Sequence, residues 1–170
     1  MRRHLFVAMS LMLLMLVGHV ALACEGQSAS QAFNFRKGQA VYISAFRRER
    51  AGYNPDYPNS IIGYICNNDI GYEGKIREEF GKLQYFKVVD KVSDAEFVFL
   101  VNIEYNSAEG FSLSTGKYTE WKDKSDKEKS DIDALRETSY KGALVGPFKL
   151  PTTGKISSQL AKKFHTAVAH

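Results

Sequence analysis

The strongest constraint on the fold is the run from Glu96 to Tyr105, EFVFLVNIEY, which has the β-branched and aromatic composition of a β-strand. One face of this strand is apolar throughout and carries Phe97, Phe99, Val101, Ile103 and Tyr105. The other face begins with Val98 and Leu100 and ends with Asn102 and Glu104. We therefore expect a central strand, buried on both faces at its start and on one face at its end, with a helix on one side.

The remaining elements are predicted around this strand. Further strands are expected at 40–46, at 85–90, within 107–116 and at 140–150, where Pro147 places the last strand at an edge or forces a break. A first amphipathic helix follows the N-cap residues Asn67, Asn68 and Asp69, and its apolar face carries Ile70, Ile76, Phe80 and Leu83. A second helix is indicated by the apolar stripe Ile156, Leu160, Phe164, Ala167 and Val168.

The order of these elements is β-α-β-β-β-α, which predicts an α+β fold. The first two strands are joined through a helix, which predicts a parallel pair with a right-handed crossover. The short turn at 93–95 predicts that the next two strands are antiparallel. The sequence thus predicts a two-layer mixed β-sheet with two helices packed on one face.

Three segments are expected to lie outside this framework. Residues 47–60, RRERAGYNPDYPNS, have the Pro, Gly and Asn content of a long loop, and residues 61–66 have no firm assignment. Residues 117–129 are a charged tract with only Tyr118 and Trp121 as apolar side chains, which predicts a solvated loop or excursion. Ser130 and Asp133 then match a capping box that opens a helical turn.

The chain divides into three predicted parts. Residues 1–23 combine a positive start, an apolar stretch and a small-residue cleavage site, which is typical of a signal peptide. Residues 24–37 are expected to be a polar tether, and residues 38–170 a single α+β domain with the charged excursion at 117–129. The formal charge of +4 falls to about +2 without the leader. The length excludes a large two-domain enzyme, and the 44% hydrophobic content excludes a disordered chain.

Only two cysteines, Cys24 and Cys66, are present, which excludes a four-cysteine zinc site. An oxidising compartment favours a disulfide between them, closing a loop of about 42 residues and contributing roughly 3–4 kcal/mol in the chain-entropy model. The alternative is lipid attachment at Cys24, because a lipoprotein signal also ends in a small residue followed by Cys. In that case Cys66 is a lone thiol.

The best candidate for a partner-binding surface is the segment that carries Arg47, Arg48, Arg50, Tyr53 and Tyr57. Loops at the carboxyl ends of strands are common binding positions, and Arg and Tyr are enriched among interface anchors. The alternative interpretation is an exposed loop with ordinary surface charges.

No motif predicts a catalytic residue, a metal ion or a cofactor. Ser114 and Lys117 match the S-x-x-K pattern, but about one such match is expected by chance. After the predicted leader, the only histidines are His165 and His170, which lie at the C-terminus. The basic C-terminal stretch is interpreted as the exposed Lys face of the last helix, so no nucleic-acid partner is expected.

The segment 38–105 resembles a group of small bacterial envelope domains, on the residues Phe86, Val88, Val89, Asp90, Asp94 and Ala95, with Glu96 at a usual Asp position. The group includes the amino-terminal domain of the Tol-system propeller protein, the curli secretion lipoprotein and the lipoprotein activators of peptidoglycan synthases. The resemblance implies a fold and an envelope role, and it carries no catalytic residues.

These patterns together predict an exported, non-enzymatic envelope protein that is periplasmic or secreted and binds a protein partner, such as a wall-synthesis enzyme or a secretion component. An outer-membrane lipoprotein is the alternative, and contact with a membrane is expected only if Cys24 is lipidated. A small secreted enzyme or enzyme inhibitor is the other alternative. Its site would not be visible in the sequence, since carboxylates such as Asp69, Glu73 and Glu104 could meet in space.

Overall fold

The computed structural model describes residues 33–53, 61–104, 107–140, 143–149 and 155–169. In chain order its elements are β1 (Ala40–Tyr53), β2 (Ile61–Asn68), α2 (Ile70–Leu83), β3 (Lys87–Val89), the 3₁₀ turn η1 (Val92–Asp94), β4 (Phe97–Glu104), β5 (Ser107–Leu113), α3 (Thr115–Lys122), α4 (Asp126–Lys129), α5 (Ile132–Thr138), β6 (Val145–Lys149) and α6 (Ile156–Val168).

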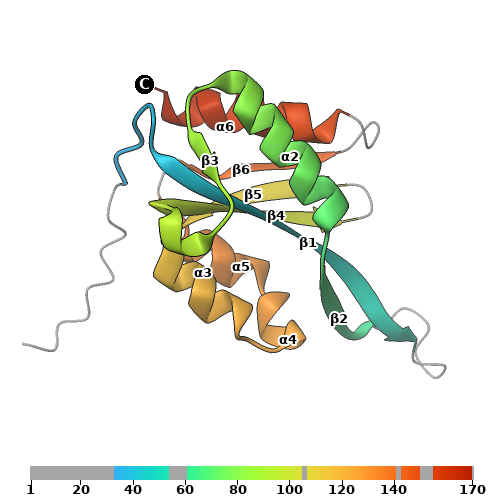
Figure 1. Cartoon of the computed structure of the whole chain (residues 1–170). Coiled ribbons are helices and arrows are strands. Elements are labelled where there is room, and N and C mark those ends of the chain that lie inside the picture. The colour runs from blue at the N-terminus through green and yellow to red at the C-terminus, as the bar shows by residue number, and fades with distance from the viewer. Residues whose placement is uncertain (1–32, 54–60, 105–106, 141–142, 150–154, 170) are drawn as a thin grey trace, which may run out of the picture.

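The strands form one six-stranded mixed sheet, with the order β2-β1-β4-β5-β6 and with β3 added to β1 (Figure 1). β1 is parallel to β3 and β4, whereas the pairs β1–β2, β4–β5 and β5–β6 are antiparallel. β4 lies at the centre and is buried from Phe97 to Ile103, and β6, which contains Pro147, lies at an edge. The α+β class, the central strand, the edge position of the last strand and the parallel pairing of the first two predicted strands are confirmed.

Helices cover both faces of the sheet, so the predicted two-layer arrangement is wrong (Figure 1). The two predicted helices, α2 and α6, pack together on the face that carries Phe97 and Phe99. The opposite face, with Val98 and Leu100, is covered by side chains of α3 and α5, namely Tyr118, Trp121, Ile132 and Leu135. The domain therefore has three layers with the sheet in the middle.

The charged tract 117–129 forms most of α3 and all of α4, so the predicted loop is wrong, although most of its charged side chains are exposed. Tyr118 and Trp121 lie about one helical turn apart on α3 and are both buried, while Lys117, Glu120 and Lys122 of the same helix are exposed. The Trp121 ring packs 4.8 Å from the Phe46 ring of β1, centroid to centroid. Two aromatic anchors thus bind a largely charged segment to the sheet.

Caps set the starts of these short helices. Ser114 accepts a hydrogen bond from the Lys117 backbone N–H at 3.2 Å, and Ser125 forms a capping box with Glu128. α5 begins after Asp131, which accepts from the Ala134 N–H, so the predicted capping box of Ser130 and Asp133 is wrong.

β3 and β4 do not form the predicted antiparallel pair. Val41 and Tyr42 of β1 pair with both strands, so β3 and β4 lie on opposite edges of β1 and both run parallel to it. The connection between them contains η1, and it is long enough to cross the end of β1. The Lys87 N–H donates to Gln39 O on one edge, and the Glu96 N–H donates to Ala40 O on the other, each at 2.9 Å.

The predicted polar tether is wrong at its C-terminal end. Phe33 stacks on Tyr140 with ring centroids 4.3 Å apart, and Phe35 lies edge-on to Phe97 at 5.1 Å. Both phenylalanines pack against the core on the α2–α6 face. The domain therefore includes the chain from residue 33, while residues 24–32 lie outside the described residues.

The buried faces of α2 and α6 follow the predicted periodicity, but in each helix one predicted residue is exposed and other residues are buried instead. Asp69 caps α2 as predicted, but Ile70 is 80% exposed and Tyr72 takes its place on the buried face, four residues before Ile76. In α6, Ala167 is exposed, and Ser157 and Ala161 extend the buried stripe instead. None of the helices in the described part of the chain has the length and hydropathy of a transmembrane span.

Candidate functional site

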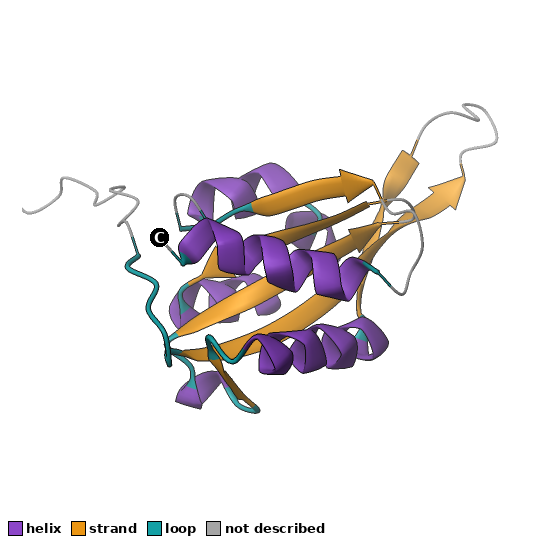
Figure 2. Cartoon of the chain, turned by 90° about the horizontal axis from the view of Figure 1, so that it is seen from above, coloured by secondary structure: helices purple, strands orange, loops and turns teal. Residues whose placement is uncertain are grey.

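The most distinctive surface feature is a hairpin that extends beyond the rest of the sheet (Figures 1 and 2). Pairing of β1 with β4 ends at Arg47, opposite Ile103, whereas pairing of β1 with β2 continues to Tyr53. Among the strands that the structure describes, residues 48–53 therefore pair with β2 alone, and β2 has no second neighbour. We call residues 48–53 and 61–66 the β1–β2 arm.

The arginines predicted to lie in a loop belong to β1, so the predicted loop at 47–60 is wrong over its first part. A strand forms there because residues 61–68, which the sequence left largely unassigned, supply the antiparallel partner β2. Tyr53 is the last residue of β1. Tyr57 lies outside the described residues.

Arg47 and Arg48 point to opposite faces of the sheet, and each is held by a carboxylate. Arg47 donates to Asp69 from Nε at 3.1 Å and from Nη2 at 2.7 Å. Arg48 pairs with Glu104, donates to the Ser130 carbonyl oxygen at 2.8 Å and lies over the Tyr64 ring at 4.6 Å. These two residues therefore fasten the foot of the β1–β2 arm to the domain.

Arg50 differs from its two neighbours because it is exposed and forms no ion pair with the described residues. Its partner in the β1–β2 register is Tyr64. Of the three predicted arginines, Arg50 is thus the one whose charge is available to another molecule.

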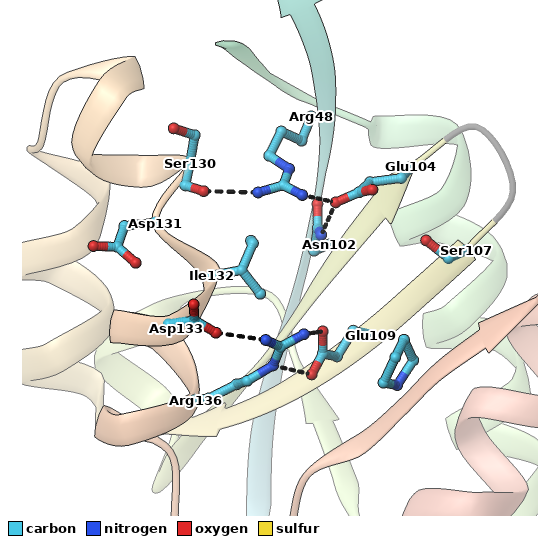
Figure 3. A pocket seen from close by; sticks show the side chains of 11 residues that line it. Arg48, Asn102, Glu104, Ser107, Glu109, Ser130, Asp131, Ile132, Asp133 and Arg136 are labelled. Carbon is cyan, nitrogen blue, oxygen red and sulfur yellow. Dashed lines mark hydrogen bonds and ion pairs between the residues drawn. The ribbon is translucent and has the colours of Figure 1, made fainter. Parts of the chain in front are cut away.

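A polar groove of about 420 Å³ opens at the foot of the arm, between the ends of β4 and β5 and the start of α5 (Figure 3). Side chains from β1, β4, β5, β6 and the segment 130–136 line it. They are Arg48, Asn102, Glu104, Ser107, Glu109, Ser130, Asp131, Ile132, Asp133, Arg136 and Pro147. This volume lies within the range of ligand-binding pockets.

Two arginine–carboxylate pairs span the groove (Figure 3). Arg136 donates to both oxygens of Glu109 at 2.8 Å and to Asp133 at 2.6 Å. Glu109 is 5% exposed, and its hydrogen bonds raise the pKa of the Arg136 guanidinium. In the second pair, Glu104 Oε1 accepts from Arg48 and also from the Asn102 amide at 3.2 Å.

The groove also contains two buried polar atoms without a hydrogen-bond partner among the described residues. They are Nε of Arg48 and Oδ1 of Asn102. Asn102 is 3% exposed, and an unpaired buried acceptor is unfavourable by about 1–3 kcal/mol. Buried polar groups left in this state inside a groove are candidates for contact with a bound group.

Cys66 lies on β2 and is half-buried, with its Sγ atom 3.7 Å from the Asp126 carbonyl oxygen. Burial raises the pKa of its thiol. Within the described residues Cys66 forms no disulfide, and Cys24 lies outside them, so the predicted pairing stays a prediction.

The other residues considered from the sequence have structural surroundings. Ser114 caps α3, which accounts for its spacing to Lys117, and His165 lies edge-on to the Tyr85 ring at 4.7 Å. Asp69 and Glu104 pair with arginines rather than with each other. In the ranges that the structure describes, no three His, Cys, Asp or Glu residues are grouped in a way that could hold a metal ion.

Reasoning from the sequence missed Asn102, Glu109 and Arg136 as site residues. A signal for one of them was present, because the second face of β4 changes from Val98 and Leu100 to Asn102 and Glu104. Glu109 of β5 lies directly opposite Asn102 of β4 in the strand register. The polar end of this face of β4 therefore continues onto the neighbouring strand β5.

Comparisons with protein-family models, with curated proteins and with solved structures find no match.

Proposed function

We propose that this protein is an exported, non-enzymatic envelope protein that binds a protein partner through the β1–β2 arm. The predicted signal peptide of residues 1–23 supports export. The partner site is supported by the arm itself, which extends beyond the sheet with two unpaired strand edges.

Unpaired strand edges offer backbone N–H and C=O groups to another chain. Within the described residues, β2 is unpaired along its outer edge, and β1 is unpaired on the β4 side from residue 48 onward. Edges of this kind bind an extended segment of a partner by β-strand addition, in which the main chain supplies affinity and side chains supply specificity. A binding role for the β1–β2 arm therefore needs no rearrangement of the domain.

The side chains around the arm also suit a protein partner. Three large hydrophobic residues are exposed among the described residues. Two of them, Ile65 at 43% in β2 and Ile70 at 80% at the start of α2, lie on or near the arm. Arg50 adds an exposed positive charge on the paired strand. Apolar contact combined with an arginine is typical of interface anchors.

Paired surface variants test this proposal. Arg50→Glu with Ile65→Thr changes the arm, and Lys162→Glu with Leu144→Thr makes the same kinds of change at exposed positions elsewhere. Each substitution is expected to alter the free energy of unfolding by no more than about 0.5 kcal/mol. The tagged proteins are produced in the native host, and proteins that co-purify from the envelope fraction are compared by quantitative mass spectrometry.

We expect the unaltered protein and the control variant to retain the same partner and the arm variant to lose at least nine-tenths of it. Retention of the partner by the arm variant, or equal loss by the control variant, would contradict the proposal. Circular dichroism spectra establish that both variants are folded.

A further inference from the structure

We propose that the groove at the foot of the β1–β2 arm binds a basic side chain of the partner, a lysine ammonium or an arginine guanidinium group. This inference rests on the proposed function, because it assigns the groove to the same partner. The groove and the arm are continuous. Arg48 lines the groove and is the first residue of β1 beyond the β4 pairing, and its register partner in β2 is Cys66.

The charge of the lining favours a cation. Four carboxylates, those of Glu104, Glu109, Asp131 and Asp133, face two guanidinium groups. Both guanidinium groups are already held by carboxylates, Arg48 by Glu104 and Arg136 by Glu109 and Asp133. An anion would have to compete with these carboxylates, whereas a cation adds a missing positive charge.

Hydrogen-bond acceptors are available at the same place. Glu104 uses Oε1 for both of its contacts, and Oε2 forms no hydrogen bond with the described residues. Oδ1 of Asn102 is unpartnered on the floor of the groove, beside Arg48 and Glu104 (Figure 3). Asp131 uses Oδ1 to cap α5 and takes part in no ion pair with the described residues. A group that donates two or three hydrogen bonds, as an ammonium does, complements these acceptors.

Two side chains in the lining have no charge and no polar side-chain atom. Ile132 and Pro147 provide apolar surface along the groove. The alkyl stem of a lysine or arginine buries against such surface while its charged end contacts carboxylates. The lining therefore suits a long basic side chain better than a small inorganic cation.

Binding of small probes to the 15N-labelled protein tests this assignment by NMR titration. The probes are n-butylammonium, which reproduces a lysine side chain, n-butanol, which has a similar shape without charge, and butyrate, which reverses the charge. We expect saturable shifts of the Asn102, Glu104 and Ser107 amides with butylammonium, binding by butanol at least fivefold weaker, and no such shifts with butyrate. Equal shifts with butanol or butyrate, or none with butylammonium, would overturn the proposal.

A charge-removing variant gives the second test. Glu104→Gln retains an acceptor for Arg48, and Asp131→Asn retains a good N-cap for α5. We expect the double variant to bind butylammonium at least tenfold more weakly, since it removes two of the negative charges that an ammonium group would contact. Glu96→Gln, in a separate Glu–Arg pair with Arg36, is the matched control and should leave binding unchanged. Unchanged binding by the double variant would overturn the proposal.

The two proposals fail separately. Co-purification through the arm together with no butylammonium binding would refute the groove site alone. If butylammonium binds but the partner still co-purifies with the arm variant, the proposed function is refuted. The assignment of the basic group to that partner is then refuted with it.

Discussion

Replacing Trp121 with alanine tests whether the helical layer of α3–α5 is part of the folded core. Trp121 is 7% exposed and packs against Phe46 of β1 and Tyr118 of α3. Burial of a tryptophan removes about 150–250 Å² from water, which corresponds to roughly 4–6 kcal/mol at about 25 cal/mol per Å². This is an upper bound because the unfolded chain already buries part of that area.

We therefore expect Trp121→Ala to lower the free energy of unfolding by about 3–4 kcal/mol, in line with other removals of buried aromatic residues. For a domain of this size the melting temperature should fall by about 10 °C or more. Lys122→Ala, at the exposed neighbouring position of α3, is the control and should change the free energy by no more than about 0.5 kcal/mol.

The assay is thermal unfolding followed by far-ultraviolet circular dichroism. Trp121 is the only tryptophan, so its fluorescence in the unaltered protein reports on α3 alone. The fluorescence and circular dichroism transitions should coincide if this layer unfolds with the sheet. A change below about 2 °C for Trp121→Ala, or a fluorescence transition well before the main one, would refute the packing of α3 described above.

Further predictions concern the other face, the pH dependence and the cysteines. Gly110→Ala should lower the free energy of unfolding by about 1–3 kcal/mol in denaturant titrations, because an added Cβ would lie 2.4 Å from Cζ of Phe99, and an unchanged midpoint would contradict this. Burial raises the pKa of Glu73 above 4.5, so the folded state binds its proton more tightly than the unfolded state does, and ionisation of Glu73 disfavours folding. Glu73→Gln should therefore raise the melting temperature more at pH 7 than at pH 4, whereas an equal or opposite difference would refute that assignment. Intact mass spectrometry of the exported protein should give a mass two hydrogens below that of the reduced chain if Cys24 and Cys66 are joined, and added acyl mass would show lipidation instead.

The central strand β4 and the last helix α6 could be predicted from the sequence because their signals are local. The alternation of large apolar residues in β4 marks both of its faces, and the stripe of Ile156, Leu160 and Phe164 marks the buried face of α6. In each of these elements, several residues at regular spacing indicate the same type of secondary structure and the same buried face. Their burial in the described structure follows directly from that pattern.

The second helical layer could not be predicted in the same way. α3 has only Tyr118 and Trp121 as buried anchors, and the charged residues around them in the sequence resemble those of a solvated loop. Its stability comes from contact with Phe46, a residue more than seventy positions earlier in the chain. A helix that depends on tertiary packing in this way leaves little periodicity in the sequence.

Less of the candidate site can be read from the sequence. The cluster of arginines marks the segment that forms the β1–β2 arm, but Arg47 and Arg48 are fixed by Asp69 and Glu104, whereas Arg50 stays exposed. The groove depends on contacts between residues that are far apart in the chain, such as Arg136 with Glu109 and Arg48 with Glu104. Contacts at such separations cannot be derived from residue spacing, and the sheet register was needed to place them.

The measurement that tests the proposed role of the β1–β2 arm most directly is site-specific photo-cross-linking in the native host. A photoreactive amino acid is placed at the exposed position of Ile65 in β2 and, as the control, at the exposed position of Lys162 in α6. We predict one discrete cross-linked partner from position 65 and none from position 162. No partner from position 65, or the same partner from both positions with equal yield, would contradict binding through the arm.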